Sequence, residues 1–312
     1  MRPGHTPLDP AGPLPVLVGP TAVGKTEVAL ELAEGIGAEI LSVDSRQVYR
    51  RLDIGTAKPT PEERARVRHH LLDLVEPAES LSAGEFARRF RAAEAEVRGR
   101  GREVLAVGGS GLYFRAVTHG LFEGARSRPD LREAWLGRSV EDLRAELLRV
   151  DPHTAARLTP RDRQRIVRAL EVFHDTGRPM SELHAARPGT PRRARMVVLT
   201  RPRAELYQRI HARLERMLER GLEQEARRVW EMRLPPSAPA ARTVGYREWF
   251  AYFEGSQPRD SALDEIRQNT RRYAKRQLTW FRAQPEAAWV EAAAGESGPD
   301  LADRIRSVLA ES

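Results

Sequence analysis

The chain has 312 residues, 40% of them apolar, and contains no cysteine. This length is enough for one large domain or two modest ones, and the lack of cysteine excludes disulfides, a cysteine nucleophile and cysteine-ligated zinc. The net charge of +8, with 52 Lys and Arg against 44 Asp and Glu, is compatible with a polyanionic partner and equally with a generally arginine-rich composition.

The chain begins with a segment rich in proline and glycine, residues 1–14, which we expect to be a loose tail. This segment lacks the apolar core of a signal peptide, so a cytoplasmic location is the default expectation. No run of about 18 apolar residues occurs in the sequence, which predicts that no helix spans a membrane.

The first third of the chain has the pattern of an α/β fold. A buried strand is predicted at residues 14–18 (LPVLV), followed by a glycine-containing loop and a helix over residues 26–36 that ends at Gly35 or Gly37. Further strands are predicted within residues 38–45 and 103–113. Strand–helix–strand order with short connections predicts a parallel sheet flanked by helices, with its turns gathered at the carboxyl edge.

Strand patterns are absent between residues 122 and 188, where helical patterns interrupted by proline predict an inserted, mostly helical subdomain. A strand over residues 195–200, helices over 203–221 and 264–284, and a short terminal strand and helix follow. Gly221 is the expected end of the first of these helices. The predicted domains are a tail (1–14), an α/β core (15–121 and 189–312) and the helical insertion (122–188).

The loop after the first strand, GPTAVGKT, fits the phosphate-binding pattern of a P-loop. Its glycines let backbone N–H groups converge on phosphate oxygens, the Lys25 ammonium can neutralise their charge, and the Thr26 hydroxyl can hold a Mg²⁺ ion that bridges phosphates. A simple tight turn is the alternative, and the pattern does not distinguish ATP from another diphosphate. The expected phosphate-binding residues are Gly19, Pro20, Thr21, Ala22, Val23, Gly24, Lys25 and Thr26.

Two other turns are expected at the same edge of the sheet. Asp44 ends the second strand, where its carboxylate could act as a general base, bind magnesium or cap a helix. The turn Gly108–Gly111 follows the third strand without an acidic residue, whereas a P-loop NTPase usually has a magnesium-binding aspartate there. Ser110 and the N–H groups of this turn could stabilise negative charge on a leaving oxygen, and a flexible turn is the alternative.

Three stretches are strongly basic: residues 161–170, 242–249 and 271–282. Each on its own is typical of a solvated helix face. All three in one chain that also has a phosphate-binding loop favour a nucleic-acid partner. The pair His69–His70 has no acidic ligand at metal spacing and is expected at the surface.

The motifs GPTAVGKT, VDSRQVYRRLDIGTAKP, GGSGLY, QRIVRALEV, TVGYREW and KRQLTWFR occur in this order. In these motifs the chain resembles the bacterial tRNA dimethylallyltransferases, also called tRNA isopentenyltransferases, from about residue 15 to 284. The resemblance implies transfer of a dimethylallyl group from dimethylallyl diphosphate to the exocyclic amine of the adenosine 3′ of the anticodon. The loop would then hold a prenyl diphosphate, in agreement with the missing acid after the third strand.

The resemblance also implies catalytic roles. Asp44 would be the general base, and Ser110 would hydrogen-bond near the breaking carbon–oxygen bond. Lys25, Arg247 and Thr26 with Mg²⁺ would stabilise the leaving diphosphate. Two departures from the family pattern are mild: Ser110 stands where threonine is common, and Val23 replaces a common serine, which removes one hydroxyl donor.

The resemblance further implies a monomer that binds tRNA and no membrane, with the helical insertion contacting the anticodon stem-loop. The residues that it places near the tRNA are Asp44, Ser45, Arg46, Gln47, Ser110, Arg132, Gln164, Arg165, Ile166, Val167, Arg168, Arg242, Gly245, Tyr246, Arg247, Lys275, Arg276, Gln277 and Arg282.

Two other function classes share part of this pattern. An ATP-dependent small-molecule kinase would share the P-loop and the parallel sheet, but it leaves the basic stretches and the acid-free turn unexplained. A non-catalytic RNA-binding protein with a relic phosphate loop would have no need of Lys25, Thr26, Asp44 and Ser110 together.

Overall fold

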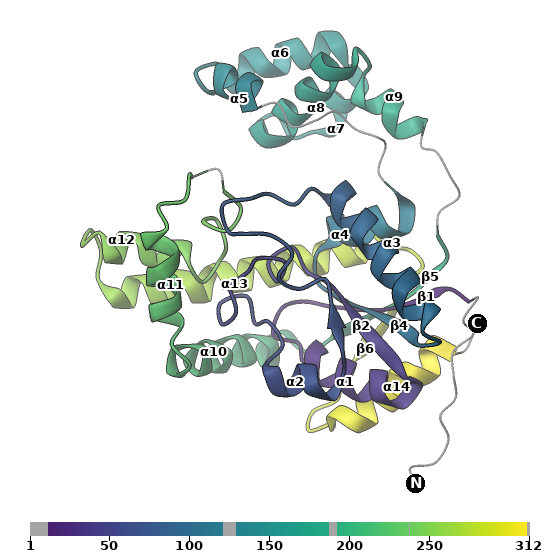
Figure 1. Cartoon of the computed structure of the whole chain (residues 1–312). Helices are drawn as coiled ribbons and strands as arrows, with labels where there is room; N and C mark the ends of the chain where they lie inside the picture. Colours follow the sequence, from purple (N-terminus) through teal and green to yellow (C-terminus); the bar gives the residue numbers. More distant parts are fainter. Residues whose placement is uncertain (1–11, 121–128, 187–191, 237, 311–312) are drawn as a thin grey trace. The chain divides into compact units, whose positions relative to one another are not determined.

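The computed structural model describes residues 12–120, 129–186, 192–236 and 238–310 (Figure 1). It divides into two compact units. Met1–Thr118 and Arg192–Ser312 form the first, and His119–Pro191 form the second. Each unit has its own hydrophobic core.

The first unit is built on a six-stranded parallel sheet in the order β3-β2-β4-β1-β5-β6. Its strands are β1 (Leu14–Val18), β2 (Ala38–Val43), β3 (His69–His70), β4 (Glu103–Gly108), β5 (Ala194–Thr200) and β6 (Ala288–Glu291). β1 pairs with β4 on one side and β5 on the other, and all of its residues are buried. Burial on both faces explains its unbroken apolar sequence. The predicted parallel α/β fold is confirmed.

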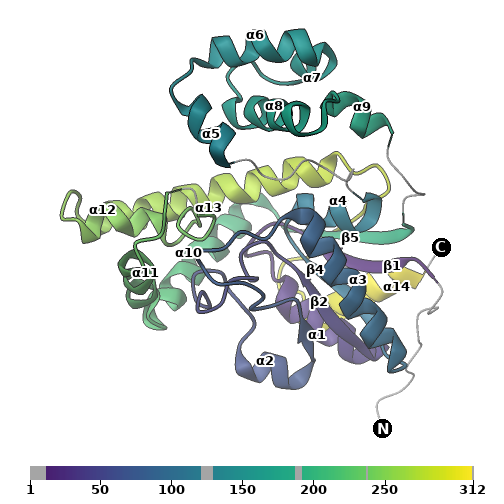
Figure 2. The same ribbon diagram turned by 45° about the horizontal axis from the view of Figure 1, so that its top comes forward.

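Helices cover both faces of the sheet, as Figure 1 and Figure 2 show. These helices are α1 (Lys25–Ile36), α3 (Ala83–Gly99), α4 (Gly111–His119) and α14 (Gly298–Ala310). α1 and α14 lie together on one face, where Ile36 and Ile305 join the main core. α3 and α4 lie on the other face, with the rings of Phe86 and Tyr113 stacked at a centroid distance of 4.0 Å. Gly37 ends α1 in a left-handed conformation, as predicted.

Between β5 and β6 the chain forms α10 (Arg203–Glu219), α11 (Leu222–Glu231), the 3₁₀ turn η1 (Arg247–Trp249), α12 (Phe250–Phe253) and α13 (Arg259–Arg282). The sequence predicted α10 and α13 but not α11. Gly221 was expected to end α10; instead, Arg220 ends that helix and Gly221, with φ of 94°, is the N-cap of α11. Among the helices described, none is long and apolar enough to cross a membrane.

The segment between β2 and α3 is mostly loop and contains one short helix, α2 (Pro61–Arg66). Thr60 begins α2 with a capping box that includes Glu63. The expectation that His69 and His70 lie at the surface is wrong, because both are half-buried and pair with β2 as the edge strand β3. His70 Nε2 lies 2.6 Å from Glu39 Oε2.

The second unit contains α5 (Pro129–Leu136), α6 (Val140–Val150), α7 (Pro152–Arg157), α8 (Arg163–Thr176) and α9 (Met180–Ala185). Its core is formed by Trp135, Leu143, Leu147, Ala155, Ile166, Ala169 and Leu170. The buried Asp151 carboxylate accepts hydrogen bonds from Thr154 N and Ser181 N, both at 2.9 Å, and so joins α7 to α9. The predicted helices are present, whereas the predicted boundaries at residues 122 and 188 lie outside the described residues.

Candidate active site

The P-loop connects β1 to α1 at the carboxyl edge of the sheet. Gly24 has a left-handed conformation (φ 104°) at the point where the loop enters the helix. At Gly19 a Cβ would lie 2.4 Å from the carbonyl oxygen of Leu199 on β5, so only glycine lets the loop pass so close to that strand. Lys25 Nζ donates to the carbonyl oxygens of Gly19 (2.9 Å) and Pro20 (2.8 Å), which holds its side chain over its own loop.

The ammonium group of Lys25 is buried and therefore partly desolvated. Burial lowers the pKa of Lys25 from 10.5 to about 8; the Asp44 carboxylate opposes this shift and the Arg213 guanidinium adds to it. At neutral pH the ammonium is therefore charged while it faces a second cation. An anion bound between these two cations would relieve their repulsion, so the local electrostatics favour a phosphate ligand.

Three arginines that the sequence analysis did not single out surround the P-loop. They donate to it in three contacts: Arg201 Nε to Val23 O (2.8 Å), Arg209 Nε to Ala22 O (3.0 Å) and Arg213 Nη2 to Thr21 Oγ1 (2.7 Å). Burial lowers the pKa of Arg213 to about 10, against the opposing effect of Asp44. Arg209 and Arg213 lie four residues apart on α10, a spacing that places both on one side of a helix and was a signal available in the sequence.

Asp44 and Ser110 lie beside the P-loop at the ends of β2 and β4. Asp44 Oδ1 accepts a hydrogen bond from Arg46 N at 2.7 Å, and none of the described residues donates to its Oδ2. Ser110 Oγ accepts from Ser45 N at 2.8 Å and donates to Ser45 Oγ at 3.1 Å. The three strand ends therefore meet, as the sequence predicted, and one oxygen of the Asp44 carboxylate is left for a ligand.

The glycines of the turn after β4 are required by close packing. A Cβ would lie 2.1 Å from Val43 O at Gly108, 2.2 Å from Gln277 Nε2 at Gly109, and 2.3 Å from Trp280 Cδ2 at Gly111. The turn is thus packed between β2 and α13, and the alternative of a flexible turn does not fit the structure. This packing fixes the position of Ser110, which is 9% exposed.

Gln277 of α13 connects the turn after β4 to the P-loop. Its side chain is 6% exposed, accepts a hydrogen bond from Thr21 N at 2.9 Å and donates to Gly109 O at 3.0 Å. Both polar ends of this amide are therefore paired with backbone groups. The tRNA contact expected of Gln277 stays a prediction, and its observed contacts hold two walls of the site together.

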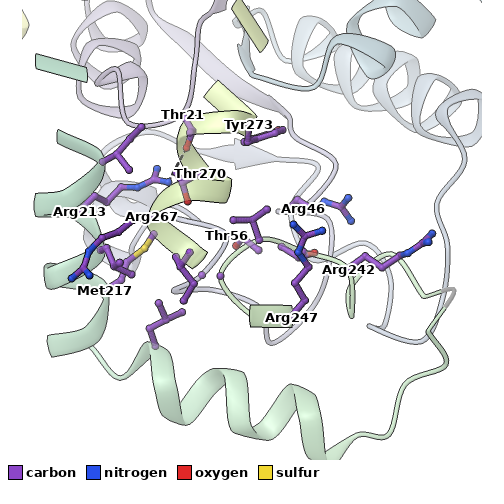
Figure 3. A pocket seen from close by; sticks show the side chains of 18 of the residues that line it. Thr21, Arg46, Thr56, Arg213, Met217, Arg242, Arg247, Arg267, Thr270 and Tyr273 are labelled. Atoms are coloured by element: carbon purple, nitrogen blue, oxygen red, sulfur yellow. Dashed lines mark hydrogen bonds between the residues drawn. The ribbon is translucent and has the colours of Figure 1, made fainter. Parts of the chain in front are cut away.

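Two adjoining cavities open at this edge, and they share the lining residues Thr21, Asp44, Thr56, Arg213 and Tyr273. One cavity continues along the P-loop past Lys25 and Thr26. The other lies between α10, α13 and the turn before η1, with Met217 on its apolar side and Arg247 across from it (Figure 3). Burial and the Asp44 charge raise the pKa of Tyr273, so its hydroxyl stays protonated at neutral pH.

The other predicted residues of the first unit differ in exposure. Those with exposed side chains are Arg242, Arg247, Lys275, Arg276 and Arg282; those that are half-buried are Ser45, Arg46 and Gln47; those that are buried are Gly245 and Tyr246. Arg46 Nη1 donates to Pro239 O at 2.6 Å, and Gln47 Oε1 accepts from Ser42 Oγ at 2.8 Å. Arg242, Arg247 and Arg46 line the second cavity, which the structure therefore brings together with Asp44.

In the second unit the predicted residues lie on α5 and α8. Arg132 Nε pairs with the buried carboxylate of Glu171 at 2.5 Å, and Arg168 Nη1 reaches the same carboxylate at 3.4 Å. Arg165 is well exposed and pairs with Asp162 of its own helix at 3.3 Å. The three remaining residues are Gln164, which is exposed, Ile166, which is in the core, and Val167, which is half-buried.

A magnesium ion fits the donor set of this site. No group of three or more His, Cys, Asp or Glu side chains suited to a metal is found among the residues that the structure describes. Mg²⁺ keeps several waters and is commonly held by one or two protein oxygens together with substrate phosphates. Thr26, which has a hydroxyl side chain, lines the P-loop cavity, and one protein oxygen together with substrate phosphates is the kind of sparse oxygen set that such an ion uses.

Comparisons with known proteins agree over most of the chain. The family model for IPP transferase matches residues 47–284. A tRNA dimethylallyltransferase of Syntrophobacter fumaroxidans is 45% identical over 287 residues, which cover 90% of this chain and 84% of that protein. Another, of Halorhodospira halophila, is 48% identical over 283 residues, or 88% and 91% of the two chains.

A solved structure shows the same architecture. The crystal structure of a tRNA isopentenylpyrophosphate transferase from Bacillus halodurans matches with a TM-score of 0.70 and 36% sequence identity, over 95% of this chain and 96% of that chain. The similarity to these proteins thus covers both the amino-acid sequence and the fold. The chain belongs to the IPP transferase family.

Proposed function

We propose that this protein transfers a dimethylallyl group from dimethylallyl diphosphate to the exocyclic amine of the adenosine 3′ of the anticodon in tRNA, and releases diphosphate. The observation that carries the proposal is the place of Asp44, which lines a cavity that continues along the P-loop and whose Oδ2 accepts no hydrogen bond from the described residues. The relatives are named tRNA dimethylallyltransferases, which supports it. A magnesium-binding acid after β4, as a kinase would carry, is replaced by Gly109 and Ser110.

Asp44 supplies the base for this reaction. The adenine nitrogen attacks the first carbon of the prenyl group, the bond from that carbon to the diphosphate oxygen breaks, and the proton of the amine passes to the Asp44 carboxylate. The hydrogen bond from Arg46 N fixes one carboxylate oxygen and leaves the other for the proton. Base assistance of this kind contributes about 10²–10⁴ in rate.

The departing diphosphate is held by the cations around the P-loop. Lys25, Arg213 and the N–H groups of the loop surround the place where its charge develops, and Arg247 approaches from the second cavity. Ser45 N donates to Ser110 Oγ and fixes it, and on substrate binding the Ser110 hydroxyl would turn its proton from Ser45 Oγ toward the breaking bond. Thr26 would hold Mg²⁺, which when bound neutralises part of the diphosphate charge.

The acceptor is a folded RNA, and the basic residues fit it. The target adenosine must leave its stack to reach Asp44, at a cost of a few kcal/mol that is smaller in a loop than in a duplex. Arg165 on α8 and the exposed cations Lys275, Arg276 and Arg282 on α13 suit contacts to phosphates. We expect a cytoplasmic monomer whose helical insertion, residues 122–188, contacts the anticodon stem-loop.

The experiment that tests the proposal follows labelled dimethylallyl diphosphate into an unmodified anticodon stem-loop with adenosine 3′ of the anticodon, in the presence of magnesium. Asp44→Asn is the sharpest variant, because asparagine keeps an oxygen for Arg46 N but cannot take the proton. Asp303→Asn is the matched control, since Asp303 is an exposed aspartate on α14. A stem-loop with guanosine at the target position tests the acceptor.

Transfer should require adenosine and should fall by about 10²–10⁴ in Asp44→Asn, with RNA binding retained. If Asp44→Asn lost RNA binding by as large a factor as it lost transfer, Asp44 would have a structural role. Absence of transfer by the unaltered protein, together with ATP hydrolysis, would replace the proposal by the kinase alternative.

A further inference from the structure

Glu225 of α11 is a buried carboxylate that joins two loops of the active site. It is 2% exposed, yet it accepts hydrogen bonds from three consecutive backbone N–H groups and one hydroxyl. The donors are Asp53 N (3.0 Å), Ile54 N (2.9 Å), Gly55 N (2.9 Å) and Tyr246 OH (2.7 Å). The three N–H groups belong to the loop that follows Asp44, and the hydroxyl belongs to the turn that carries Arg247.

Within the described part of the chain, no Lys, Arg or His forms an ion pair with Glu225. Its charge is therefore stabilised by dipoles alone, and these donors fill both carboxylate oxygens. Burial and the Glu225 charge raise the pKa of Tyr246 well above its usual value, so that the hydroxyl remains a donor throughout the range in which the enzyme works. Removal of the carboxylate would leave three buried N–H groups without an acceptor.

The two loops also touch directly at Gly55. A Cβ at that position would lie 2.5 Å from Tyr246 Cζ, so the Tyr246 ring packs directly against the backbone of Gly55. Glycine is needed here because any side chain would push the two loops apart. The contact and the shared Glu225 carboxylate together set the distance between them.

Both loops form walls of the cavity that contains Asp44. Gly55 and Thr56 line it from one loop, and Gly245 and Arg247 line it from the other. A second buried carboxylate, Glu248, orders the latter turn by accepting from Gly245 N and Arg247 Nε. Arg247 is thus fixed to its turn by Glu248, and the turn is fixed to the facing wall by Tyr246 and Glu225.

We propose that Glu225 is a positioning residue, which acts through Tyr246 to hold Thr56 and Arg247 at the separation that the transfer reaction requires. Glu225 is not among the residues that line either cavity, so we assign it no catalytic role. This inference rests on the proposed prenyl transfer. It predicts a defect in the chemical step, because the hydrogen bonds of Glu225 go to residues 53–55 and Tyr246 and not to the P-loop.

The test compares Glu225→Gln, Tyr246→Phe and the double variant in the full-length protein. Glutamine has the same shape but turns one acceptor oxygen into a donor that faces N–H groups, whereas phenylalanine removes one hydroxyl and keeps the ring on Gly55. Glu231→Gln, an exposed change at the end of the same helix, is the matched control. We would measure kcat, KM for dimethylallyl diphosphate, the unfolding midpoint, and amide exchange in residues 52–57 and 243–248.

We expect Glu225→Gln to lower kcat by about 100-fold, as a displacement near 1 Å can. The KM for the prenyl diphosphate should stay within about threefold, because binding at the P-loop is untouched. Tyr246→Phe should lower kcat less, and the double variant should be no slower than Glu225→Gln, since residues that act through one another are not additive. Amide exchange should quicken in both loops of Glu225→Gln.

A folded Glu225→Gln protein with the kcat of the unaltered enzyme would overturn the proposal, as would multiplicative effects in the double variant. If Glu225→Gln does not fold, Tyr246→Phe decides: a kcat equal to that of the unaltered protein counts against the proposal. An unaltered protein that transfers no prenyl group refutes the proposed function instead. In that case amide exchange still shows whether Glu225 couples the two loops.

Discussion

The positive charge of Lys25 favours binding of an anionic ligand but destabilises the folded protein when no ligand is bound. Its pKa of about 8 in the folded protein lies below the value of 10.5 expected in the unfolded chain. Between these values the unfolded chain binds more protons, so the contribution of Lys25 to the free energy of unfolding rises as the pH increases from about 8 to 10.5. Below pH 8 the buried ammonium is destabilising, which is the usual compromise at a binding site.

The same shift predicts that affinity for the prenyl diphosphate weakens in alkaline solution. Above about pH 8 the Lys25 side chain of the free protein is mostly neutral, and it must take up a proton before it can bind the anion as an ammonium group. The dissociation constant should therefore rise by up to about tenfold per pH unit. Calorimetric titration between about pH 7 and 9 measures this, a range below the pKa of Arg213. The Lys25→Met variant should bind the prenyl diphosphate weakly, with a dissociation constant that does not change over this pH range. If its dissociation constant changed with pH as in the unaltered protein, another group would be responsible for the pH dependence.

The sequence identified Asp44 and Lys25 but not Arg213. Asp44 directly follows β2, and Lys25 stands at the end of the loop that follows β1. Strand ends meet at one edge of a parallel sheet, so the proximity of these two residues follows from local pattern. Arg213 lies on α10, far along the chain, and reaches Thr21 only because that helix packs beside the P-loop. The four-residue spacing of Arg209 and Arg213 is visible in the sequence, but nothing local shows that this side of α10 faces the P-loop.

At the scale of elements, the turn after β4 depends on glycine for packing. A Cβ at Gly108 would lie 2.1 Å from the Val43 carbonyl oxygen, a backbone atom of β2 that no side-chain rotation can move. Gly108→Ala should therefore lower the free energy of unfolding by about 1–3 kcal/mol, in the range of overpacked cores. It should also slow prenyl transfer, because it separates β2, with Asp44, from β4.

Gly84→Ala is the matched control for this prediction. Gly84 lies in the first turn of α3, and apart from its chain neighbours and the backbone of its own helix no described atom lies within 4 Å of the place that a Cβ would take. Alanine there should stabilise the protein by about 0.5–1 kcal/mol. Denaturant unfolding of both variants measures the contrast, and a Gly108→Ala protein as stable as the unaltered one would show that the two strands can separate at little cost.

The elements that the sequence analysis missed lack a clear pattern of their own, for different physical reasons. α11 buries Leu222, Ala226 and Val229, but its buried face also contains Glu225, which breaks the apolar period on which helix prediction rests. β3 has two residues, and pairing with β2 defines it rather than any pattern of its own. The periodic helices α1, α10 and α13 and the continuous apolar strands were predicted, because their signal is contained in the segment itself. The equally long α3 was not predicted, and its buried face also contains an acid, Glu94.

At the scale of the whole molecule, the two units differ in how their arginines are buried and paired. In the first unit the cations near the P-loop are partly buried and are bonded to the loop. In the second, Arg132 and Arg168 share the buried carboxylate of Glu171, whereas Arg165 extends from α8 and, among the described residues, forms a surface ion pair with Asp162 alone. Such a pair is worth little, so Arg165 can exchange its partner for a phosphate at small cost.

We therefore predict that Arg165 makes a phosphate contact with the RNA. Arg165→Gln should flatten the log–log salt dependence of stem-loop binding by about 0.7–0.9, the slope that one phosphate contact contributes, with little change in unfolding midpoint. Fluorescence anisotropy of a labelled anticodon stem-loop over a series of salt concentrations measures this slope.

The control for this prediction is Arg88→Gln on α3. The Arg88 side chain is 72% exposed, as is that of Arg165, and each arginine pairs with an acid three residues earlier in the chain, Glu85 in the first turn of α3 and Asp162 at the N-cap of α8. The two substitutions remove the same charge from the same kind of surface, so long-range electrostatics alone would flatten both slopes equally. A change confined to Arg165→Gln means a direct contact from the helical unit; equal slopes in the two variants would contradict it, because the RNA would then sense only net charge.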